Sequence, residues 1–375
     1  MPAVDRTTLR GVRRLVIKIG SAVLAPKGEL SPASVRQICE QVTEIIASGR
    51  QVVIVSSGAV ASGFRLLGLE KPPKAIRQKQ AAAAIGQPRL MAEYASCFAG
   101  DRLAVAQVLL TAEDFEKRAR FLNARHTLET LLESGVVPII NENDSVSFDE
   151  IKLGDNDRLS ALAASMLRAD LLVMLSSVPG LLGGTKNVLS HVPDVEAARA
   201  HVRAEKSGVG TGGMGTKLDA AAIVTRVGIP AVIASGEVGR VVPRLLEGED
   251  IGTFFEPRRG RAVDSRRRWI GLSARAQGVI SIDAGAVGAL RKRGASLLAS
   301  GIAGCQGAFE RGAVVEVRGP RSELVARGVS AYSADEIGKI RGRKAGEIAR
   351  VLGYVVADEV VHRDDLLLMP LEDEP

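Results

Sequence analysis

Short apolar runs alternate with amphipathic helical stretches over the first two thirds of the chain, and this alternation restricts the fold more than any other feature. Residues 15–19 have the pattern of a strand, and Ser31 and Pro32 then mark a helix start, followed by apolar residues at helical spacing up to Gly49. The same pattern predicts strands at 52–55, 103–110, 136–140, 171–175, 231–234 and 253–255, and helices at 76–98, 113–133, 158–167 and 217–227. Such alternation builds an α/β domain with a mostly parallel central sheet sandwiched by helices, and ligands bind at the carboxyl ends of its strands.

The last third of the chain has a different sequence pattern. Residues 258–268 hold six arginines and one aspartate, which is typical of an exposed linker. Beyond them, short β-like runs at 278–282, 313–317, 324–326 and 366–369 are separated by glycines. A length of 375 residues also favours two domains. The sequence therefore predicts a first domain over residues 1–257, an arginine-rich linker over 258–270 and a small β-rich domain over 271–375.

Composition excludes several classes of protein. With 46% hydrophobic and 25% charged residues the chain is close to the globular average, which argues against disorder and coiled coil. No apolar run reaches the roughly 18 residues of a membrane helix, and the first 14 residues carry charges where a signal peptide is apolar, so we expect a soluble, cytoplasmic protein. Residues 258–375 hold 20 Lys and Arg against 15 Asp and Glu, which suits either an anionic partner or an ordinary solvated surface.

Cysteine and histidine offer little catalytic chemistry. The three cysteines and four histidines form no CxxC pair, no HExxH motif and no nucleophile motif: Cys39, Cys97, Cys305, His126, His191, His201 and His362. We therefore expect neither a disulfide framework nor a metal site made by the protein itself.

Two polar features follow the first strands. Lys18 interrupts an apolar strand, so its ammonium group either needs an anionic partner in a dry interior or lies at the strand end and reaches solvent. Ser57 follows the second strand in a Ser-Ser-Gly-Ala segment, which is typical of a ligand loop and also of an ordinary turn.

The glycine-rich segment 207–217 is the most unusual composition in the chain. It contains GxGxxG matches, but the polar residues before it cannot form the strand that a dinucleotide fingerprint needs, and no GxxxxGK[ST] P-loop exists. The remaining interpretations are a phosphate-binding loop with Thr211, Thr216 and Lys217 at a helix start, or a surface loop.

Two acidic and amide clusters follow strands or precede a helix. The first is the run Asn141 to Asp144, and the second is the trio Asp155, Asn156 and Asp157. These residues suit an amino-acid pocket, and members of the trio also suit the role of helix cap.

Five motifs in order and register resemble the members of the amino acid kinase family that phosphorylate glutamate, and the similarity covers nearly the whole chain. The motifs are Val16-Ile-Lys-Ile-Gly-Ser21, Val53-Ile-Val-Ser-Ser-Gly-Ala59, Ile140-Asn-Glu-Asn-Asp144, Lys152-Leu-Gly-Asp-Asn-Asp-Arg-Leu-Ser-Ala-Leu162 and Gly210-Thr-Gly-Gly-Met-Gly-Thr-Lys217. The C-terminal part resembles a PUA domain. The resemblance implies ATP-dependent phosphorylation of the γ-carboxylate of L-glutamate, the first step of proline biosynthesis, with Mg²⁺ bound to the nucleotide.

Residue by residue, the resemblance implies that Lys18 and Lys217 contact the transferring phosphoryl group and that Asp157 organises them. It implies that Ser57, Asp144 and Asn156 hold glutamate. It also implies an ATP site made by Lys18, Ser176, Ser177, Thr211, Gly212, Gly213, Met214, Gly215, Thr216 and Lys217. Proline as feedback inhibitor, a homo-oligomer and RNA as a partner of the PUA-like domain follow from the resemblance as well.

One stretch departs from the family pattern. Where the family has Thr-Asp or Ser-Asp before a Gly-Leu-Tyr loop, this chain has Ser176-Ser177 followed by Val-Pro-Gly-Leu-Leu. The missing carboxylate and tyrosine predict an altered ATP affinity or nucleoside preference. The alternatives to glutamate phosphorylation are a related kinase of the same fold acting on aspartate, acetylglutamate or carbamoyl phosphate, and an RNA-binding protein with a kinase-like scaffold.

Overall fold

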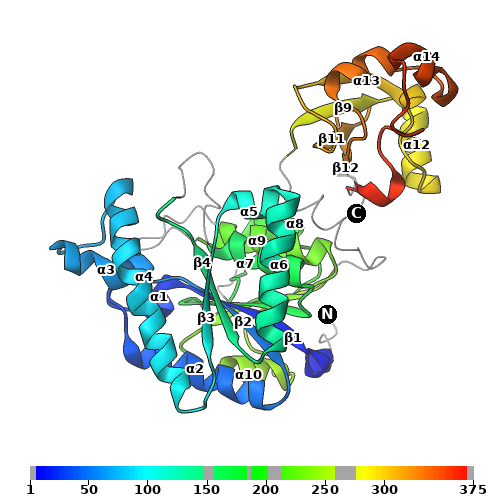
Figure 1. The fold of residues 1–375 in the computed structure, drawn as a ribbon. Coiled ribbons are helices and arrows are strands. Elements are labelled where there is room, and N and C mark those ends of the chain that lie inside the picture. Colours follow the sequence, from blue (N-terminus) through cyan, green and yellow to red (C-terminus); the bar gives the residue numbers. More distant parts are fainter. Residues whose placement is uncertain (1–5, 147–155, 184–186, 202–212, 258–275, 370–375) are drawn as a thin grey trace. The chain divides into compact units, whose positions relative to one another are not determined.

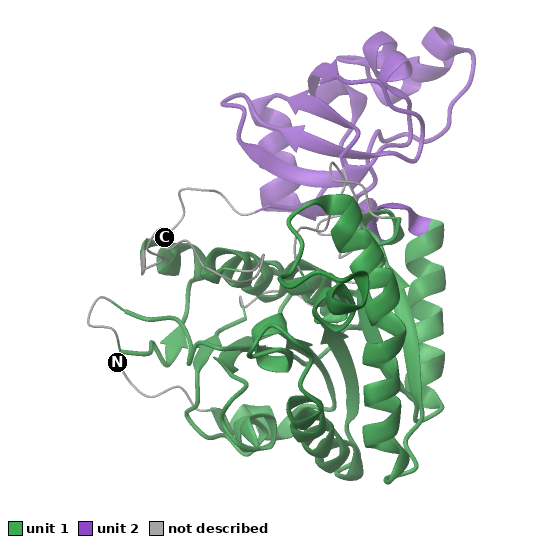
Figure 2. Cartoon of the chain, turned by 90° about the vertical axis from the view of Figure 1, so that its left-hand side faces the viewer, with its two compact units in different colours: residues 1–114, 119–262 green, residues 115–118, 263–375 purple. Residues whose placement is uncertain are grey.

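The computed structural model describes residues 6–146, 156–183, 187–201, 213–257 and 276–369. The chain forms two compact units, residues 1–114 with 119–262 and residues 115–118 with 263–375 (Figure 2). The predicted linker at 258–270 lies outside the described residues, so the predicted domain bounds stay a prediction.

The first unit is built on an eight-stranded sheet in the order β3-β4-β2-β1-β5-β7-β8-β6 (Figure 1). All its strand pairs are parallel except β7 with β8. The predicted mostly parallel sheet is therefore confirmed. Its strands are β1 (Arg14–Ile19), β2 (Gln51–Ser56), β3 (Val105–Leu110), β4 (Val137–Glu142), β5 (Leu171–Ser176), β6 (His191–Val192), β7 (Ala231–Ser235) and β8 (Thr253–Phe255).

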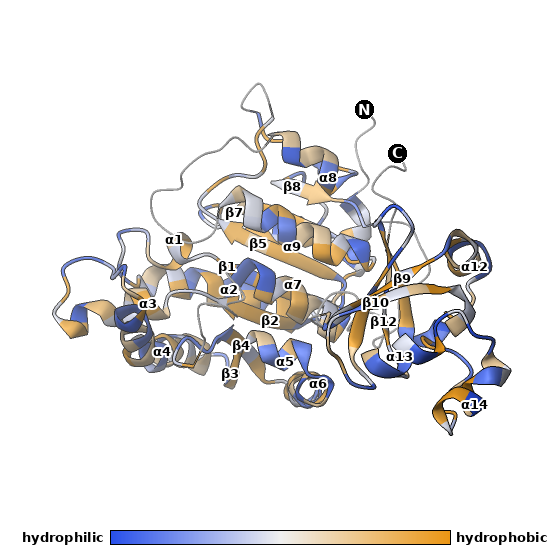
Figure 3. Ribbon diagram, turned by 90° about the horizontal axis from the view of Figure 1, so that it is seen from above, coloured by the Kyte–Doolittle hydropathy of each residue, from blue (hydrophilic) through white to orange (hydrophobic). Residues whose placement is uncertain are grey.

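Helices cover both faces of this sheet. Alternate side chains of each strand face one side of the sheet and pack with α2, α4 and α10 in a continuous apolar core. Helices α7 and α9 pack against the other face. The central strands are apolar along most of their length (Figure 3), because they are buried on both faces. The helices are η1 (Arg6–Gly11), α1 (Ser21–Leu24), α2 (Pro32–Ala47), α3 (Ala59–Gly63), η2 (Phe64–Leu67), α4 (Ile76–Ala99), α5 (Ala112–Glu116), α6 (Arg118–Glu133), α7 (Asn156–Leu167), α8 (Val195–Ala198), η4 (Arg199–His201), α9 (Met214–Arg226) and α10 (Val241–Leu246).

Several helix boundaries differ from the predicted ones, and α7, predicted from residue 158, begins at Asn156. The N-cap at Ser31 is confirmed, since its side chain accepts a hydrogen bond from Ser34 N at 3.3 Å. The single helix predicted at 113–133 is two helices, α5 and α6, with Lys117 between them. Helix α9 begins at Met214 rather than at Lys217, because Gly213 takes the extended N-cap conformation and the chain is helical from the next residue.

Helices α3 and α4 cross with their backbones in direct contact. An added Cβ on Gly63 would lie 2.0 Å from the carbonyl oxygen of Ala82, and one on Gly86 would lie 1.8 Å from that of Ala59. Only glycine fits at either position, so this crossing fixes α4 beside the loop that follows β2.

The second unit contains a five-stranded sheet in the order β10-β9-β11-β12-β13 with its own apolar core. The predicted β-rich domain is therefore confirmed, and the sequence pattern missed β10, in which a glycine stands among other small or polar residues. Its elements are β9 (Gly278–Ile282), α12 (Ala284–Arg293), η6 (Ala299–Gly301), β10 (Ile302–Gln306), β11 (Val314–Arg318), β12 (Leu324–Val329), α13 (Ala334–Ile340), η7 (Ala345–Glu347), α14 (Ile348–Leu352), η8 (Arg363–Asp365) and β13 (Leu366–Leu368). Among the described residues of the whole chain, every helix is too short or too polar to cross a membrane.

Candidate active site

The three predicted catalytic residues meet in the interior of the first unit. Asp157, on the first turn of α7, is fully buried, and Lys18 and Lys217 are 3% and 4% exposed. The carboxylate of Asp157 forms an ion pair with Lys18 through Oδ1, and its Oδ2 accepts a hydrogen bond from Lys217 Nζ at 3.1 Å. One buried carboxylate thus holds two ammonium groups from β1 and α9.

The strand alternation explains the position of Lys18. Residues 15, 17 and 19 of β1 face the core under α2 and α4, so Lys18 faces α7 on the opposite side of the sheet. Strand β1 lies between β2 and β5 in the sheet, with α2 and α4 packed on one face and α7 on the other, so both faces are dry. The alternative in which Lys18 reaches solvent at the strand end is wrong, and the partner that its charge requires is Asp157.

The charges of the trio determine its protonation. Burial alone would raise the pKa of Asp157, but the neighbouring Lys18 and Lys217 outweigh it and hold that pKa below the ordinary value of 3.8. Thr216 Oγ1 adds a hydrogen bond to Oδ2 at 2.8 Å. Asp157 is therefore ionised at neutral pH, and the two ammonium groups carry one more positive charge than their shared partner neutralises.

Asn156 binds neighbouring residues through its amide instead of capping α7. Its Nδ2 lies within hydrogen-bond distance of three acceptors that share its two hydrogens: the carbonyl oxygen of Ser56 at 3.1 Å, Ser57 Oγ at 3.0 Å and Asn141 Oδ1 at 2.9 Å. Helix α7 begins at Asn156, so Asn156 and Asp157 lie inside it and not at its N-cap position, contrary to the capping interpretation, and Asp155 lies outside the described residues. The two predicted glutamate residues Ser57 and Asn156 are thus in contact.

Asp144 lies in a turn directly after β4, at the same sheet edge as the ends of β1 and β2. Its side chain is half-buried. The structure therefore places Asp144, like Ser57 and Asn156, at the carboxyl ends of the central strands, where a parallel sheet binds ligands.

The sequence analysis missed two buried polar residues of this region, Gln87 and Tyr94, and it noted Asn141 only as part of the run from Asn141 to Asp144. Asn141 is 3% and Gln87 is 7% exposed, and Asn141 Nδ2 donates to Gln87 Oε1 at 2.9 Å. Tyr94 OH lies 2.9 Å from Ser56 Oγ, and burial raises the pKa of this phenol, which keeps it neutral. The signal in the sequence was polar residues inside otherwise apolar or small-residue stretches, which does not reveal long-range partners.

The predicted ATP residues lie at two neighbouring places. Ser176 is half-buried at the end of β5, and Ser177 beside it is exposed. Gly213 is the N-cap of α9, and Met214, Gly215 and Thr216 form its first turn, whose backbone N–H groups have no partners within the helix. Thr211 and Gly212 lie outside the described residues.

These residues fit a nucleotide. A helix start and two lysines supply donors and positive charge for phosphate groups, as ATP requires. In the described part of the chain, no three His, Cys, Asp or Glu side chains form a group suited to a metal. A magnesium ion that arrives with the nucleotide is consistent with this donor set.

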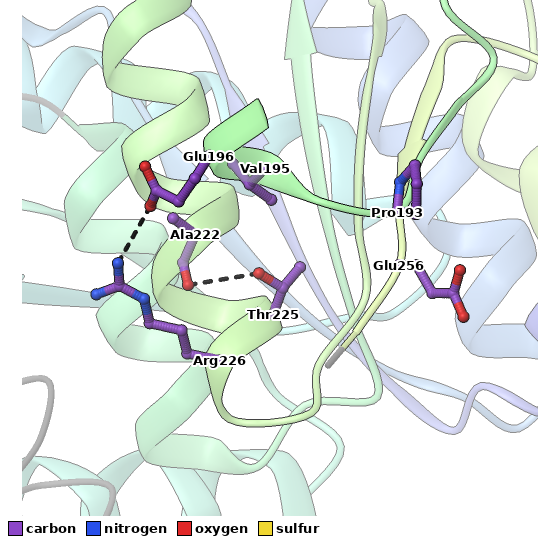
Figure 4. A pocket seen from close by; sticks show the side chains of 7 residues that line it. All are labelled: Pro193, Val195, Glu196, Ala222, Thr225, Arg226 and Glu256. Atoms are coloured by element: carbon purple, nitrogen blue, oxygen red, sulfur yellow. Dashed lines mark hydrogen bonds and ion pairs between the residues drawn. The ribbon is translucent and has the colours of Figure 1, made fainter. Parts of the chain in front are cut away.

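A small hollow on α8 and α9 lies apart from these residues (Figure 4). It has room for about one water molecule, and Glu196 and Arg226 at its rim form an ion pair of 3.1 Å. None of the predicted site residues lines it, so it has no part in the site.

Comparison with known proteins follows the same division of the chain. The amino acid kinase family matches residues 13–235, and the PUA domain matches residues 278–352. A solved structure of Giardia carbamate kinase covers 66% of this chain and 100% of its own length at 19% identity, with a TM-score of 0.49.

Curated relatives match the chain from end to end. Glutamate 5-kinase of Moorella thermoacetica is 45% identical over 97% of this chain and 98% of its own. Glutamate 5-kinase of Geobacter sp. strain M21 is 44% identical over 96% and 99%, and that of Thermus thermophilus is 46% identical over 95% and 97%. With a buried lysine-aspartate-lysine trio at the carboxyl edge of its sheet, the chain therefore belongs to the amino acid kinase family, among the glutamate 5-kinases that carry a C-terminal PUA domain.

Proposed function

We propose that this protein transfers the γ-phosphoryl group of ATP to the γ-carboxylate of L-glutamate, which gives L-glutamyl 5-phosphate and opens proline biosynthesis. The observation that carries this proposal is the trio of Lys18, Asp157 and Lys217, which holds two ammonium groups at the carboxyl edge of a parallel sheet. Relatives at about 45% identity over almost the whole chain are glutamate 5-kinases.

The chemistry needs no general base. The γ-carboxylate of glutamate has a pKa near 4.3 and is ionised at neutral pH, so it attacks phosphorus without losing a proton. The scarcity of histidine in the chain is therefore consistent with the reaction. Phosphoryl transfer depends on positioning and on neutralising the charge of the γ-phosphate, and lysines and backbone amides supply both.

Lys18 and Lys217 take the catalytic roles in this proposal. Their ammonium groups reach Asp157 from different elements, so a phosphoryl group in front of the trio would meet both charges. Asp157 keeps the two like charges together, and its depressed pKa keeps it ionised while it does so. Because the carboxylate is buried, water competes little with these contacts.

Ser57, Asn156 and Asp144 hold the amino acid in this proposal. Asn156 uses its Nδ2 for protein acceptors, which leaves its Oδ1 as an acceptor for the ammonium group of glutamate. Ser57 Oγ accepts a hydrogen bond from Asn156, so its own hydroxyl hydrogen can be donated to a carboxylate. Asp144 adds a negative charge that attracts the same ammonium group.

In this proposal Ser176 at the end of β5, Ser177 beside it and the residues Thr211 to Lys217 hold the nucleotide, and Mg²⁺ on its phosphates would supply further charge neutralisation. The exposed Ser177 offers no carboxylate, so we expect ATP affinity or nucleoside preference to differ from enzymes that have aspartate there. We further propose feedback inhibition by proline, whose ammonium and carboxylate groups suit the Asp144 region. A homo-oligomer and RNA binding by the PUA domain remain proposals that rest on the family resemblance.

A panel of amino acids tests the function. Each is incubated with ATP, Mg²⁺ and hydroxylamine, which traps an acyl phosphate as a hydroxamate. We expect hydroxamate with L-glutamate and little with L-aspartate or N-acetylglutamate, and equal rates on aspartate would refute the substrate. Adding millimolar proline to the glutamate reaction tests the proposed feedback inhibition, and undiminished activity would refute it.

A further inference from the structure

Four carboxamide side chains form a line from the edge of the sheet to the predicted glutamate residues. The line consists of Gln107 on β3, Gln87 on α4, Asn141 on β4 and Asn156 at the start of α7, and we call it the carboxamide relay. Gln87 Nε2 donates to Gln107 Oε1 at 3.2 Å. Asn141 Nδ2 donates to Gln87 Oε1 at 2.9 Å, and Asn156 Nδ2 donates to Asn141 Oδ1 at 2.9 Å.

Backbone groups fix the direction of the relay. The N–H of Glu142 can only donate, and it lies 2.9 Å from Asn141, so the atom it meets is Oδ1. Asn141 therefore donates from Nδ2 to Gln87, and the atom of Gln87 that accepts this hydrogen bond must be Oε1. At the other end the carbonyl of Ser56 can only accept, so Asn156 presents Nδ2 and keeps Oδ1 for a ligand.

Burial makes Gln87 and Asn141 the members of the relay that water cannot replace. Gln87 and Asn141 are 7% and 3% exposed, whereas Gln107 is exposed on the edge strand. Without an acceptor at residue 87, the buried Nδ2 of Asn141 would lose its hydrogen-bond partner. Because an unsatisfied buried donor costs free energy, the side chain of Asn141 would then rotate or shift toward another acceptor. Without Gln107, solvent can hydrogen-bond Gln87 Nε2 directly.

We propose that Gln87 is a positioning residue for the amino-acid substrate. It holds Asn141 in one orientation, and Asn141 in turn holds the amide of Asn156, which contacts Ser57. This inference rests on the proposed function, because it assigns Gln87 an effect on the residues proposed to bind glutamate. Gln87 follows Gly86, so the backbone crossing of α3 and α4 sets its location.

The test compares three variants in the hydroxamate assay of the full chain. Gln87→Met keeps the volume of the side chain but removes both hydrogen bonds. Gln87→Glu restores an acceptor toward Asn141. Gln41→Met is the matched control, because Gln41 is 3% exposed and also uses both amide atoms, donating to Gln37 O and accepting from Val242 N.

We expect Gln87→Met to raise KM for glutamate about tenfold, while kcat and KM for ATP stay within about twofold of wild type, because the affected contacts are equal in ground and transition states. Gln87→Glu should recover most of the lost affinity, and Gln41→Met should leave KM for glutamate unchanged. An unchanged KM for glutamate in Gln87→Met overturns the inference. So does a rise that Gln41→Met shares, since both changes would then act through general stability.

Two measurements separate this failure from failure of the proposed function. Wild-type enzyme that makes no hydroxamate from glutamate refutes the function, and the inference with it. If wild type is active and Asn156→Ala raises KM for glutamate, but Gln87→Met does not, only the positioning role of Gln87 is refuted.

Discussion

Lys217, the fourth residue of α9, places its ammonium group 3.1 Å from the carboxylate of Asp157, the second residue of α7. The same carboxylate pairs with Lys18 from the centre of the sheet. Helices α7 and α9 pack against each other, so the two lysines are brought to one point by a strand and by two helices that share a face of the sheet. The catalytic arrangement thus depends on the packing of that face.

Removal of either lysine is expected to stop chemistry and leave the fold intact. Lys217→Ala and Lys18→Ala should each lower kcat by roughly a hundredfold or more, because a water-shielded charge contact made in the transition state is worth about 3 to 4 kcal/mol. Lys339→Ala, which removes an exposed lysine of the second unit, is the control for charge loss. A Lys217→Ala enzyme with normal kcat would refute the assigned role.

Asp157→Asn should reveal the pH dependence of the trio. The pKa of Asp157 is below its ordinary 3.8 in the folded protein, so its ionisation contributes stability that is fully present above that value and is lost as pH falls through the folded pKa. At pH 7 the variant should be less stable by about 3 to 5 kcal/mol, because two buried ammonium groups lose their partner. Urea unfolding measured from pH 7 to pH 3 should show that the difference in unfolding free energy between wild type and Asp157→Asn narrows below about pH 3.8. A difference that stays constant over this range would contradict this account.

Asp144→Ala should chiefly raise KM for glutamate. Its carboxylate would contact the ammonium group of the substrate equally in ground and transition states, so kcat should change little. Steady-state kinetics with each substrate varied in turn separates the two constants. Asp101→Ala, which removes an exposed carboxylate elsewhere in the first unit, should leave both unchanged, and a fall in kcat alone for Asp144→Ala would argue for a catalytic role instead.

Gly86→Ala should destabilise the first unit strongly. The new methyl group would lie 1.8 Å from the carbonyl oxygen of Ala59, and backbone cannot turn aside as a flexible side chain does. We expect a loss of more than about 3 kcal/mol in unfolding free energy. Gly100→Ala is the control, since nothing lies within 4 Å of its added Cβ. Equal melting temperatures for the two variants would show that the helices can separate freely.

A chain ending at Pro257 should still make hydroxamate. The eight-stranded sheet and the described residues of the proposed site all precede that point. Strand β8 also runs antiparallel to β7, so the chain reaches Phe255 opposite Ala231, at the sheet edge away from Lys18 and Asp144. An insoluble or inactive product would show that the second unit completes the catalytic fold. An altered mass of the truncated chain in solution would assign subunit contacts to the second unit. RNA binding by residues 270–375 that weakens steeply between low and physiological salt would assign RNA binding to it.

Strands were more predictable from the sequence than the site was. The strands at 52–55 and 171–175 lie in the middle of the sheet, where burial on both faces imposes continuous apolar runs. Two-residue β6 and glycine-containing β10 carry no such signal. Lys18 could be singled out because a charge in a dry strand is conspicuous, whereas Gln87 lies in a helix of mixed polarity. Its partner Asn141 is 54 residues away, a pairing that local pattern does not encode.

The pairing of Lys18 with Asp157 also sets an order of events during synthesis. The two residues are separated by about 140 positions, so at roughly 5 to 20 residues per second the ribosome makes the carboxylate about 7 to 28 s after the lysine. Until then β1 carries a charge that no dry interior accepts, and its neighbour β5 has not been made either. We expect nascent chains stalled before residue 157 to leave β1 accessible to protease, and chains that extend past β7 to protect it.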